Sequence, residues 1–145
     1  MPEVRIGPAT EDTLSKCLKH GVWAGRKALP NNWKKDQVII VRIESYISAI
    51  GIVLDGETET NSELIGEGFP KVLKVKWVWS AEKIGERVET KSWYRDLMES
   101  VWGPNYGYRS LNQTPLPLKE SKIFLKEIQT RQPSTNKIIE ALLKI

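Results

Sequence analysis

The sequence is poor in the residues that build covalent cross-links and metal sites. It contains one cysteine and one histidine in 145 residues. One cysteine cannot form an intramolecular disulfide, and neither a cysteine-based zinc site nor a histidine-rich metal site can be assembled. We therefore expect no bound metal and no cofactor. The low cysteine content is typical of a reducing compartment, so we expect a cytoplasmic protein.

Long apolar runs and enzyme signatures are also missing. No stretch approaches the ~18 apolar residues of a membrane span, and no secretory signal pattern opens the chain, so we expect no membrane partner. The chain has no Walker loop, no dinucleotide-binding fingerprint and no nucleophile elbow. The single cysteine also excludes the zinc deaminase pattern. The expectation is a binding domain and not an enzyme.

The length and charge that are present suit one small domain with a polyanionic partner. The 145 residues are 40% hydrophobic and 28% charged, which fits a single domain over 1–145. The net charge is +4 and the isoelectric point is about 9.2. Six tryptophans are an unusually high number, and such residues serve either the core or stacking surfaces. Abundant lysine and glutamate favour a thermophilic source.

Apolar periodicity predicts an α+β arrangement, in which a small sheet or open barrel is flanked by helices. The predicted strands are Glu3 to Ile6, Gln37 to Ile43, Tyr46 to Leu54 and Lys71 to Trp79. The predicted helices run from a Thr10 cap to about Lys19, from Ser92 to Trp102, from Glu120 to Thr130 and from a Ser134 cap onward. We expect a turn at Asp55–Gly56 and loops at Val22 to Pro30, Glu57 to Phe69 and Gly103 to Pro117.

Two groups of residues can be interpreted as a catalytic pair or a metal site. Cys17 and His20 are three residues apart on one predicted helix and could form a nucleophile and its base. Cys17 lies on the apolar stripe of that helix, however, which favours a buried structural cysteine. Glu57, Glu59 and Glu63 crowd one loop and could bind a cation, but a solvated acidic loop is the commoner case.

An aromatic residue beside basic residues marks a candidate nucleic-acid site. Trp23 lies in a glycine-containing loop and is followed at once by Arg26 and Lys27. Such a loop suits a base held by stacking and phosphates held by charge. In the alternative interpretation, Trp23 folds inward and anchors the loop.

A second aromatic and basic group follows later in the chain. Trp102, Tyr106, Tyr108 and Arg109 lie within eight residues of one another, in a predicted loop. The alternative is a packed loop cover, which we favour for Trp102.

Several segments resemble YTH domains in collinear order. Val4 to Leu14, followed by Lys19-His20-Gly21-Val22-Trp23-Ala24, resembles their opening strand, cap, helix and G-V-W loop. The later matches are Gln37 to Ile43 with Ala49-Ile50-Gly51, Val72 to Trp79, Arg109 to Gln113, and Pro115 to Ile128. EVE domains of the same PUA-like superfamily are the nearest rival. The resemblance implies a PUA-like, YTH/EVE-type open β-barrel of about six strands with surrounding helices.

The resemblance also implies a ligand. YTH domains bind N6-methyladenine, with the base flipped into an aromatic cage. On this chain it implies that Trp23 is the first cage wall and that the Ala24 carbonyl faces the adenine N6–H. A methylated amine keeps one N–H donor and gains an apolar methyl group, so aromatic walls favour it over the unmethylated amine.

The chain departs from the YTH pattern at several cage positions. Thr13 falls where the family has an Asp or Asn that binds the adenine edge, so either Asp12 or a bridging water would take over that role. The loop that carries the second cage tryptophan in the family has no tryptophan here. Phe69, Tyr46 or Trp33 are the candidates to close the cage.

The resemblance covers some of the family's phosphate-contacting residues. Arg109 matches a family arginine that contacts backbone phosphates. The family's basic residue before the first helix falls on Gly7 here, with Arg5 as the only nearby replacement. Arg26 and Lys27 complete the predicted phosphate-binding set.

Two nucleic-acid functions remain open at the level of sequence. YTH- and EVE-like domains also form the specificity module of McrB-type modification-dependent restriction enzymes. That context predicts a reader of modified DNA, most simply N6-methyladenine, with an AAA+ NTPase motor and a nuclease subunit as partners. The alternative is an RNA-binding PUA-like domain that reads N6-methyladenine RNA or has no modification preference. A modified cytosine is a further candidate base.

Overall fold

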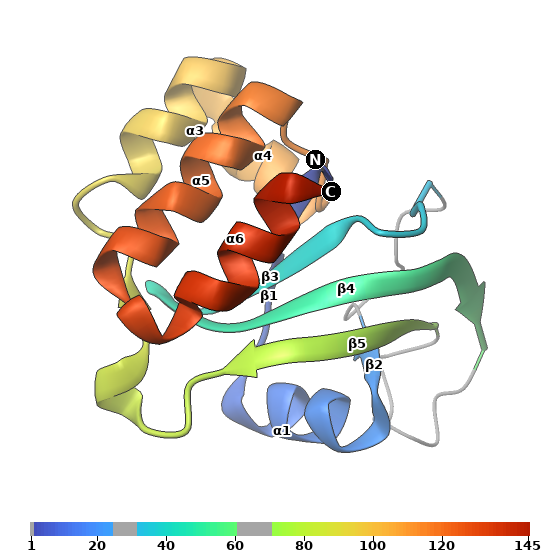
Figure 1. Ribbon diagram of the computed structural model, residues 1–145. Helices are drawn as coiled ribbons and strands as arrows, with labels where there is room; N and C mark the ends of the chain where they lie inside the picture. The colour runs from blue at the N-terminus through green and yellow to red at the C-terminus, as the bar shows by residue number, and fades with distance from the viewer. Residues whose placement is uncertain (1, 25–31, 61–70) are drawn as a thin grey trace.

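A curled sheet of six strands forms the centre of the fold in the computed structural model, which describes residues 2–24, 32–60 and 71–145 (Figure 1). The strand order is β1-β3-β4-β5-β2, with β6 paired to β4, and only the β1–β3 pair is parallel. The prediction of an α+β open barrel of about six strands is confirmed. The strands are β1 (Val4–Pro8), β2 (Val22–Ala24), β3 (Val38–Ile43), β4 (Tyr46–Glu59), β5 (Val72–Ser80) and β6 (Val88–Glu89).

Helices cover both faces of this sheet. Helix α1 (Glu11–His20) lies on one side, and the remaining helices gather on the other (Figure 1). None of the helices in the described ranges is long and apolar enough to cross a membrane. The helices on the second side are α3 (Tyr94–Trp102), α4 (Tyr106–Leu111), α5 (Leu118–Arg131) and α6 (Asn136–Lys144).

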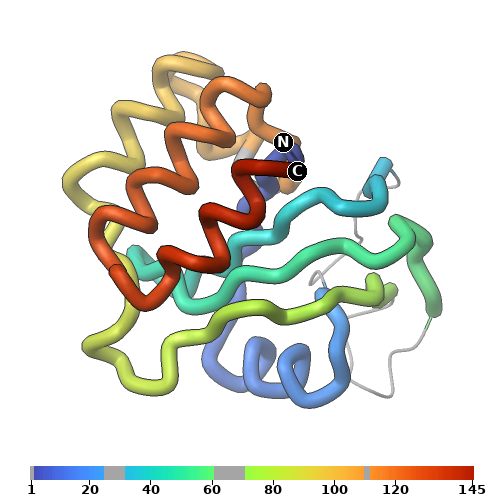
Figure 2. The backbone as a smooth tube through the Cα atoms, viewed as in Figure 1, coloured from blue at the N-terminus to red at the C-terminus, as the bar shows by residue number. Residues whose placement is uncertain are grey.

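The central strands are apolar on both sides because the sheet separates two cores. In β3, Val38 and Ile40 belong to the core under α3, α5 and α6, whereas Ile39 and Val41 belong to the core that includes α1. Strands β3, β4 and β5 run side by side between them (Figure 2). A strand covered on both faces reads as a nearly continuous apolar run, as the sequence of β3 does.

Helix α1 has the boundaries that its sequence predicts. The Thr10 side chain accepts a hydrogen bond from the Thr13 backbone N–H at 3.2 Å, so Thr10 is the N-cap. Gly21 ends the helix with φ of 66°, a left-handed conformation that glycine adopts without steric cost. The helix that positions the predicted Trp23 site is therefore fixed at both ends by local sequence.

Each predicted loop is wrong in part. Val22–Ala24 forms strand β2, which pairs with β5 and not with a sequence neighbour. Strand β4 continues through the expected Asp55–Gly56 turn to Glu59, with an irregularity in its pairing to β5 between Val53 and Thr58. The third predicted loop contains the 3-10 turn η2 (Gly103–Asn105) and helix α4.

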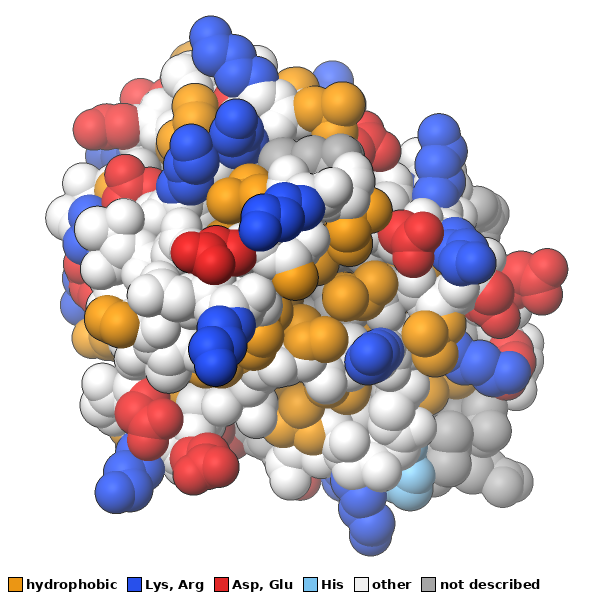
Figure 3. Space-filling view, in the orientation of Figure 1, with side chains coloured by type: hydrophobic (Ala, Val, Ile, Leu, Met, Phe, Trp, Pro, Cys, Tyr) orange, Lys and Arg blue, Asp and Glu red, His pale blue; other side chains and the backbone are white. Residues whose placement is uncertain are grey.

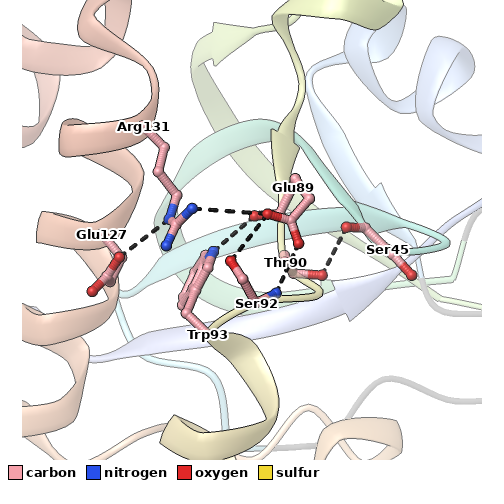
Figure 4. A network of polar contacts seen from close by, with 7 residues as sticks. All are labelled: Ser45, Glu89, Thr90, Ser92, Trp93, Glu127 and Arg131. Carbon is pink, nitrogen blue, oxygen red and sulfur yellow. Dashed lines mark hydrogen bonds and ion pairs between the residues drawn. The ribbon is translucent and has the colours of Figure 1, made fainter.

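A polar network around Glu89 explains why the predicted Ser92 cap is wrong (Figure 4). The Ser92 backbone N–H and hydroxyl both donate to the Glu89 carboxylate, at 2.8 and 3.1 Å. The Trp93 indole N–H donates to the Glu89 carbonyl at 2.7 Å, and Arg131 of α5 lies 3.8 Å from the same carboxylate. Ser92 thus anchors the chain to β6, and α3 begins at Tyr94.

The predicted Ser134 cap is also wrong. Ser134 lies inside the 3-10 turn η3 (Pro133–Thr135), and α6 begins after it at Asn136. The Ser134 hydroxyl accepts a hydrogen bond from the Trp79 indole at 3.2 Å. The serine therefore ties the last helix to β5 in place of capping it.

A buried guanidinium joins three segments that are distant in sequence. Arg5 of β1 is 1% exposed. Its donors bond the Gln37 side chain at 3.0 Å, the Asn32 carbonyl and side-chain oxygens at 2.7 and 3.1 Å, and the Gln113 carbonyl at 3.1 Å. Burial lowers the pKa of Arg5, an effect that Glu3 partly offsets. The predicted phosphate contact of Arg5 is wrong, because the guanidinium is enclosed and bonded internally.

Replacing Arg5 by methionine should destabilise the fold. Arg5→Met leaves the buried oxygens of Gln37 and Gln113 without these donors, and we expect a loss of about 2–4 kcal/mol in the free energy of unfolding. Urea denaturation followed by circular dichroism measures this loss. Arg95→Met is the matched control, because Arg95 is exposed and pairs only with Glu99 within α3. Equal stability of the two variants would refute the structural role of Arg5.

Candidate nucleic-acid interface

Trp23, the predicted first wall of a base cage, lies inside the molecule. It is the middle residue of β2, opposite Leu73 of β5, and is 0% exposed. Its indole N–H donates to the Gln113 side-chain oxygen at 2.9 Å. The inward orientation that sequence left as an alternative therefore describes this structure. The ring has a fixed position and no exposed face in this structure.

Gly7 is the residue that makes room for this ring. A Cβ atom added at Gly7 would lie 2.3 Å from Cζ2 of Trp23, well inside van der Waals contact. No side chain fits at this position while Trp23 keeps its place. The resembled family has a basic residue here, and in this structure such a side chain would clash with Trp23.

Gln113 is a site residue that the sequence reasoning did not single out. Its side chain accepts from Trp23, and its carbonyl accepts from Arg5. Its φ of 52° is positive, which is uncommon for a residue other than glycine. The only signal in the sequence is its position in the Arg109 to Gln113 segment that resembles the family. Gln113 thereby links the predicted cage residue to the buried arginine.

Trp33, a candidate second wall, shares an apolar core with Trp23. The Arg5 guanidinium lies over its ring, 4.3 Å from the centroid, a favourable cation–π geometry. Its indole Nε1 is buried and has no hydrogen-bond partner among the described residues. The structure thus brings Trp33 into the same core as Trp23, and the buried N–H remains an unused donor.

The residues predicted to bind the adenine edge lie at the start of α1. Thr13 is buried, and its hydroxyl accepts from the Thr10 hydroxyl at 3.0 Å. Asp12 is exposed and pairs with Lys16 at 3.0 Å. Ala24, whose carbonyl is the predicted acceptor for N6–H, is buried at the end of β2.

Tyr46 lies away from Trp23, and its prediction as a cage wall is wrong. It is the first residue of β4 and pairs with Glu89. Trp23 faces Leu73, whose partner on β4 is Thr58. Tyr46 and Thr58 are twelve residues apart on one strand, near its two ends. The two aromatic rings therefore belong to opposite ends of the sheet.

The predicted phosphate-binding residues have different outcomes. Arg109, on α4, is exposed, and its side chain has no ion-pair partner among the described residues. Arg26 and Lys27, and the candidate wall Phe69, lie outside the residues that the structure describes. On the face shown in Figure 3, basic and acidic side chains are interspersed, so charge on that face does not mark a single nucleic-acid surface.

The alternative catalytic and metal-binding readings find no support. Cys17 is buried, and burial raises the pKa of its thiol to about 11, partly offset by a backbone hydrogen bond from Ala24. At neutral pH this cysteine is protonated and is not an activated nucleophile. Glu59 pairs with Lys74 at 3.2 Å. Within residues 2–24, 32–60 and 71–145, no three His, Cys, Asp or Glu side chains gather as a metal site would require.

Sequence comparison and structural comparison give different results. The chain matches no protein-family model and no curated protein. Its structure is similar to the YTH domain of the Zygosaccharomyces rouxii MRB1 protein, solved in complex with N6-methyladenosine RNA, with a TM-score of 0.61 and 14% identity. That match covers 90% of this chain and 89% of the other.

Two further YTH structures agree with it. The YTH domain-containing protein mmi1, solved in an RNA complex, has a TM-score of 0.64 and 13% identity over 94% of this chain and 86% of the other. The Pho92 YTH domain, solved in complex with m6A, has a TM-score of 0.63 and 12% identity over 90% and 85%. The chain therefore has the fold of YTH domains over nearly its whole length.

Proposed function

We propose that this chain is an RNA-binding domain that recognises an N6-methylated adenine. The observation that carries the proposal is its likeness, over 90% or more of the chain, to YTH domains solved with N6-methyladenosine RNA, with RNA and with m6A. These ligands favour the RNA alternative over the modified DNA that the sequence reasoning put first. Arg109 is exposed and unpaired among the described residues, so it is available for a phosphate contact.

The chemistry of the proposed site depends on a rigidly held indole. Trp23 is fixed by its bond to Gln113 and by its packing on Gly7. An aromatic wall in a fixed position favours the methyl group of the modified base, and the Ala24 carbonyl would accept its remaining N–H. Because the ring is fully covered, a base must displace neighbouring groups to stack on it. Binding therefore selects or induces an opened form of the site.

We expect RNA with one N6-methyladenosine to bind at least about tenfold tighter than the same RNA unmethylated. Trp23→Phe keeps a ring but removes the donor to Gln113, so the ring is no longer held in place and the ratio should fall. Trp23→Ala is less informative here, because removal of a buried tryptophan lowers the free energy of unfolding by about 3–5 kcal/mol. Fluorescence-anisotropy titration at one salt concentration measures the ratio.

The matched control for the base site is Trp79→Phe. Trp79 lies on β5, and its indole bonds Ser134 next to α6, so this variant makes the same chemical change elsewhere on the sheet. It should keep the methylation ratio of the wild type. If wild-type protein binds methylated and unmethylated RNA equally, the proposed base specificity is wrong.

Arg109→Gln should lower the affinity for methylated and for unmethylated RNA by the same factor. One phosphate contact to a single strand contributes about 0.7 to the slope of log affinity against log salt, and the variant should lose that amount. Arg95→Gln is the control, because Arg95 is exposed and paired with Glu99. A loss confined to methylated RNA would contradict a phosphate role for Arg109.

Modified DNA stays the competing prediction, together with its McrB-type NTPase motor and nuclease partners. The same titration with a methylated DNA strand and duplex of matching sequence tests it, because the 2′-OH distinguishes RNA from DNA. Tighter binding to methylated DNA than to methylated RNA would favour the restriction-system role over the proposed one.

A further inference from the structure

A hollow on the helical side of the molecule lies apart from the Trp23 site. Its volume is about 690 Å³, within the range of about 300–1,000 Å³ that is common for small-ligand sites. It is formed where α3 ends and the chain turns through η2 into α4. Its lining residues are Trp102, Pro104, Asn105, Gly107, Tyr108 and Arg109.

The aromatic side chains of this hollow are available for stacking. Tyr108 is 71% exposed and makes no side-chain hydrogen bond or ring contact with the described residues. Trp102 is partly buried and is anchored against the core under α3 and α5. One aromatic ring is therefore fixed and the other is free. An exposed ring with no internal partner among the described residues can stack on a base.

The charge of the hollow suits an anion. Arg109 is exposed and unpaired among the described residues, and the lining contains no acidic residue. Arg95 of the preceding helix is already paired with Glu99 at 2.9 Å. The free guanidinium beside two aromatic rings combines the two features by which proteins hold single-stranded nucleic acid, namely stacking and phosphate contact.

The glycines of this segment leave the hollow open. Cβ atoms added at Gly103 or Gly107 would meet no atom within 4 Å. Gly107 lies within α4 and has no positive φ. Neither packing nor backbone geometry requires a glycine there, and alanine would favour the helix more. The open space next to Tyr108 thus has no structural reason within the described residues.

We propose that the hollow holds an unpaired base of the RNA next to the recognised adenine. The base stacks on Tyr108 and Trp102, and Arg109 contacts the adjoining phosphate. Arg109 lies four residues before Gln113, a stretch of at most ~14 Å, and Gln113 bonds Trp23. One strand can therefore reach both places. This inference rests on the proposed RNA function and adds a second base site to it.

Gly107→Glu tests the hollow by filling it and repelling phosphate, with no predicted clash in the fold. Affinity for a short single-stranded RNA should fall at least about tenfold, and Tyr108→Ala should cost about fivefold or more, as the loss of one stacked base does. Tyr108→Phe should bind as the wild type does. Gly85→Glu is the matched control, because Gly85 is also exposed with no atom within 4 Å of an added Cβ.

The N6-methyladenosine nucleoside separates this inference from the proposed function. Its methyl group is recognised only at the Trp23 site, so the ratio of its affinity to that of unmethylated adenosine, measured by calorimetry, should be the same for Gly107→Glu and wild type. The loss of RNA affinity in Gly107→Glu should be equal for methylated and unmethylated strands. If methylation does not change the affinity for RNA but Gly107→Glu still lowers it, the hollow is supported as a base site and the proposed base specificity is wrong.

Two results would overturn the hollow as a base site. The first is RNA affinity of Gly107→Glu and Tyr108→Ala that equals the affinity of Gly85→Glu. The second is wild-type affinity for RNA no higher than for the nucleoside, since a second base site must add to binding. Failure of the wild type to bind RNA at all would overturn both proposals.

Discussion

The fold depends on keeping one positive charge satisfied in its interior. Among the described residues, the Arg5 guanidinium has no carboxylate in direct contact and is held by amide and carbonyl oxygens of Gln37, Asn32 and Gln113. Its donors form a planar fork, so these oxygens must stand in fixed directions. The position of β1, the segment before β3 and the segment after α4 are thereby tied together. Gln113 extends this constraint to Trp23, whose indole bonds its side chain.

Local sequence patterns predicted the elements whose stabilising contacts are local or periodic. Helix α1 carries its own caps at Thr10 and Gly21, and β5 alternates apolar and polar residues, so both were predicted with nearly correct bounds. Strand β2 has three residues, too few for a period, and exists because it pairs with β5 about fifty residues later. Helix α4 contains Gly107 and follows Pro104, which read as loop residues, and it is held by contacts with α3 and β1.

For the candidate site, the motif order named residues such as Trp23, Ala24 and Arg109, and their roles stay predictions. It could not show which of the side chains are buried. The phosphate contact of Arg5 was expected only because Arg5 lies near Gly7, where the resembled family has a basic residue. In the structure its guanidinium is enclosed by contacts with Asn32, Trp33 and Gln113, which no local pattern records. Nearness in sequence to a family's binding position is therefore weak grounds for a phosphate contact when the sheet is covered on both faces.

Gly7 stands where the resembled family has a basic residue, and this bears on how the proposed RNA binding would work. The indole of Trp23 occupies the space that a side chain at position 7 would need, and Arg5 is used internally, so neither residue supplies a charge to a phosphate. Among the described residues that resemble the family's phosphate contacts, Arg109 alone remains exposed. In the proposed function, α4 would then supply the charge that contacts phosphate, and β2 would supply the base selection. Gln113 connects the two, so a substitution that moves it should alter selectivity through Trp23 without removing any phosphate contact.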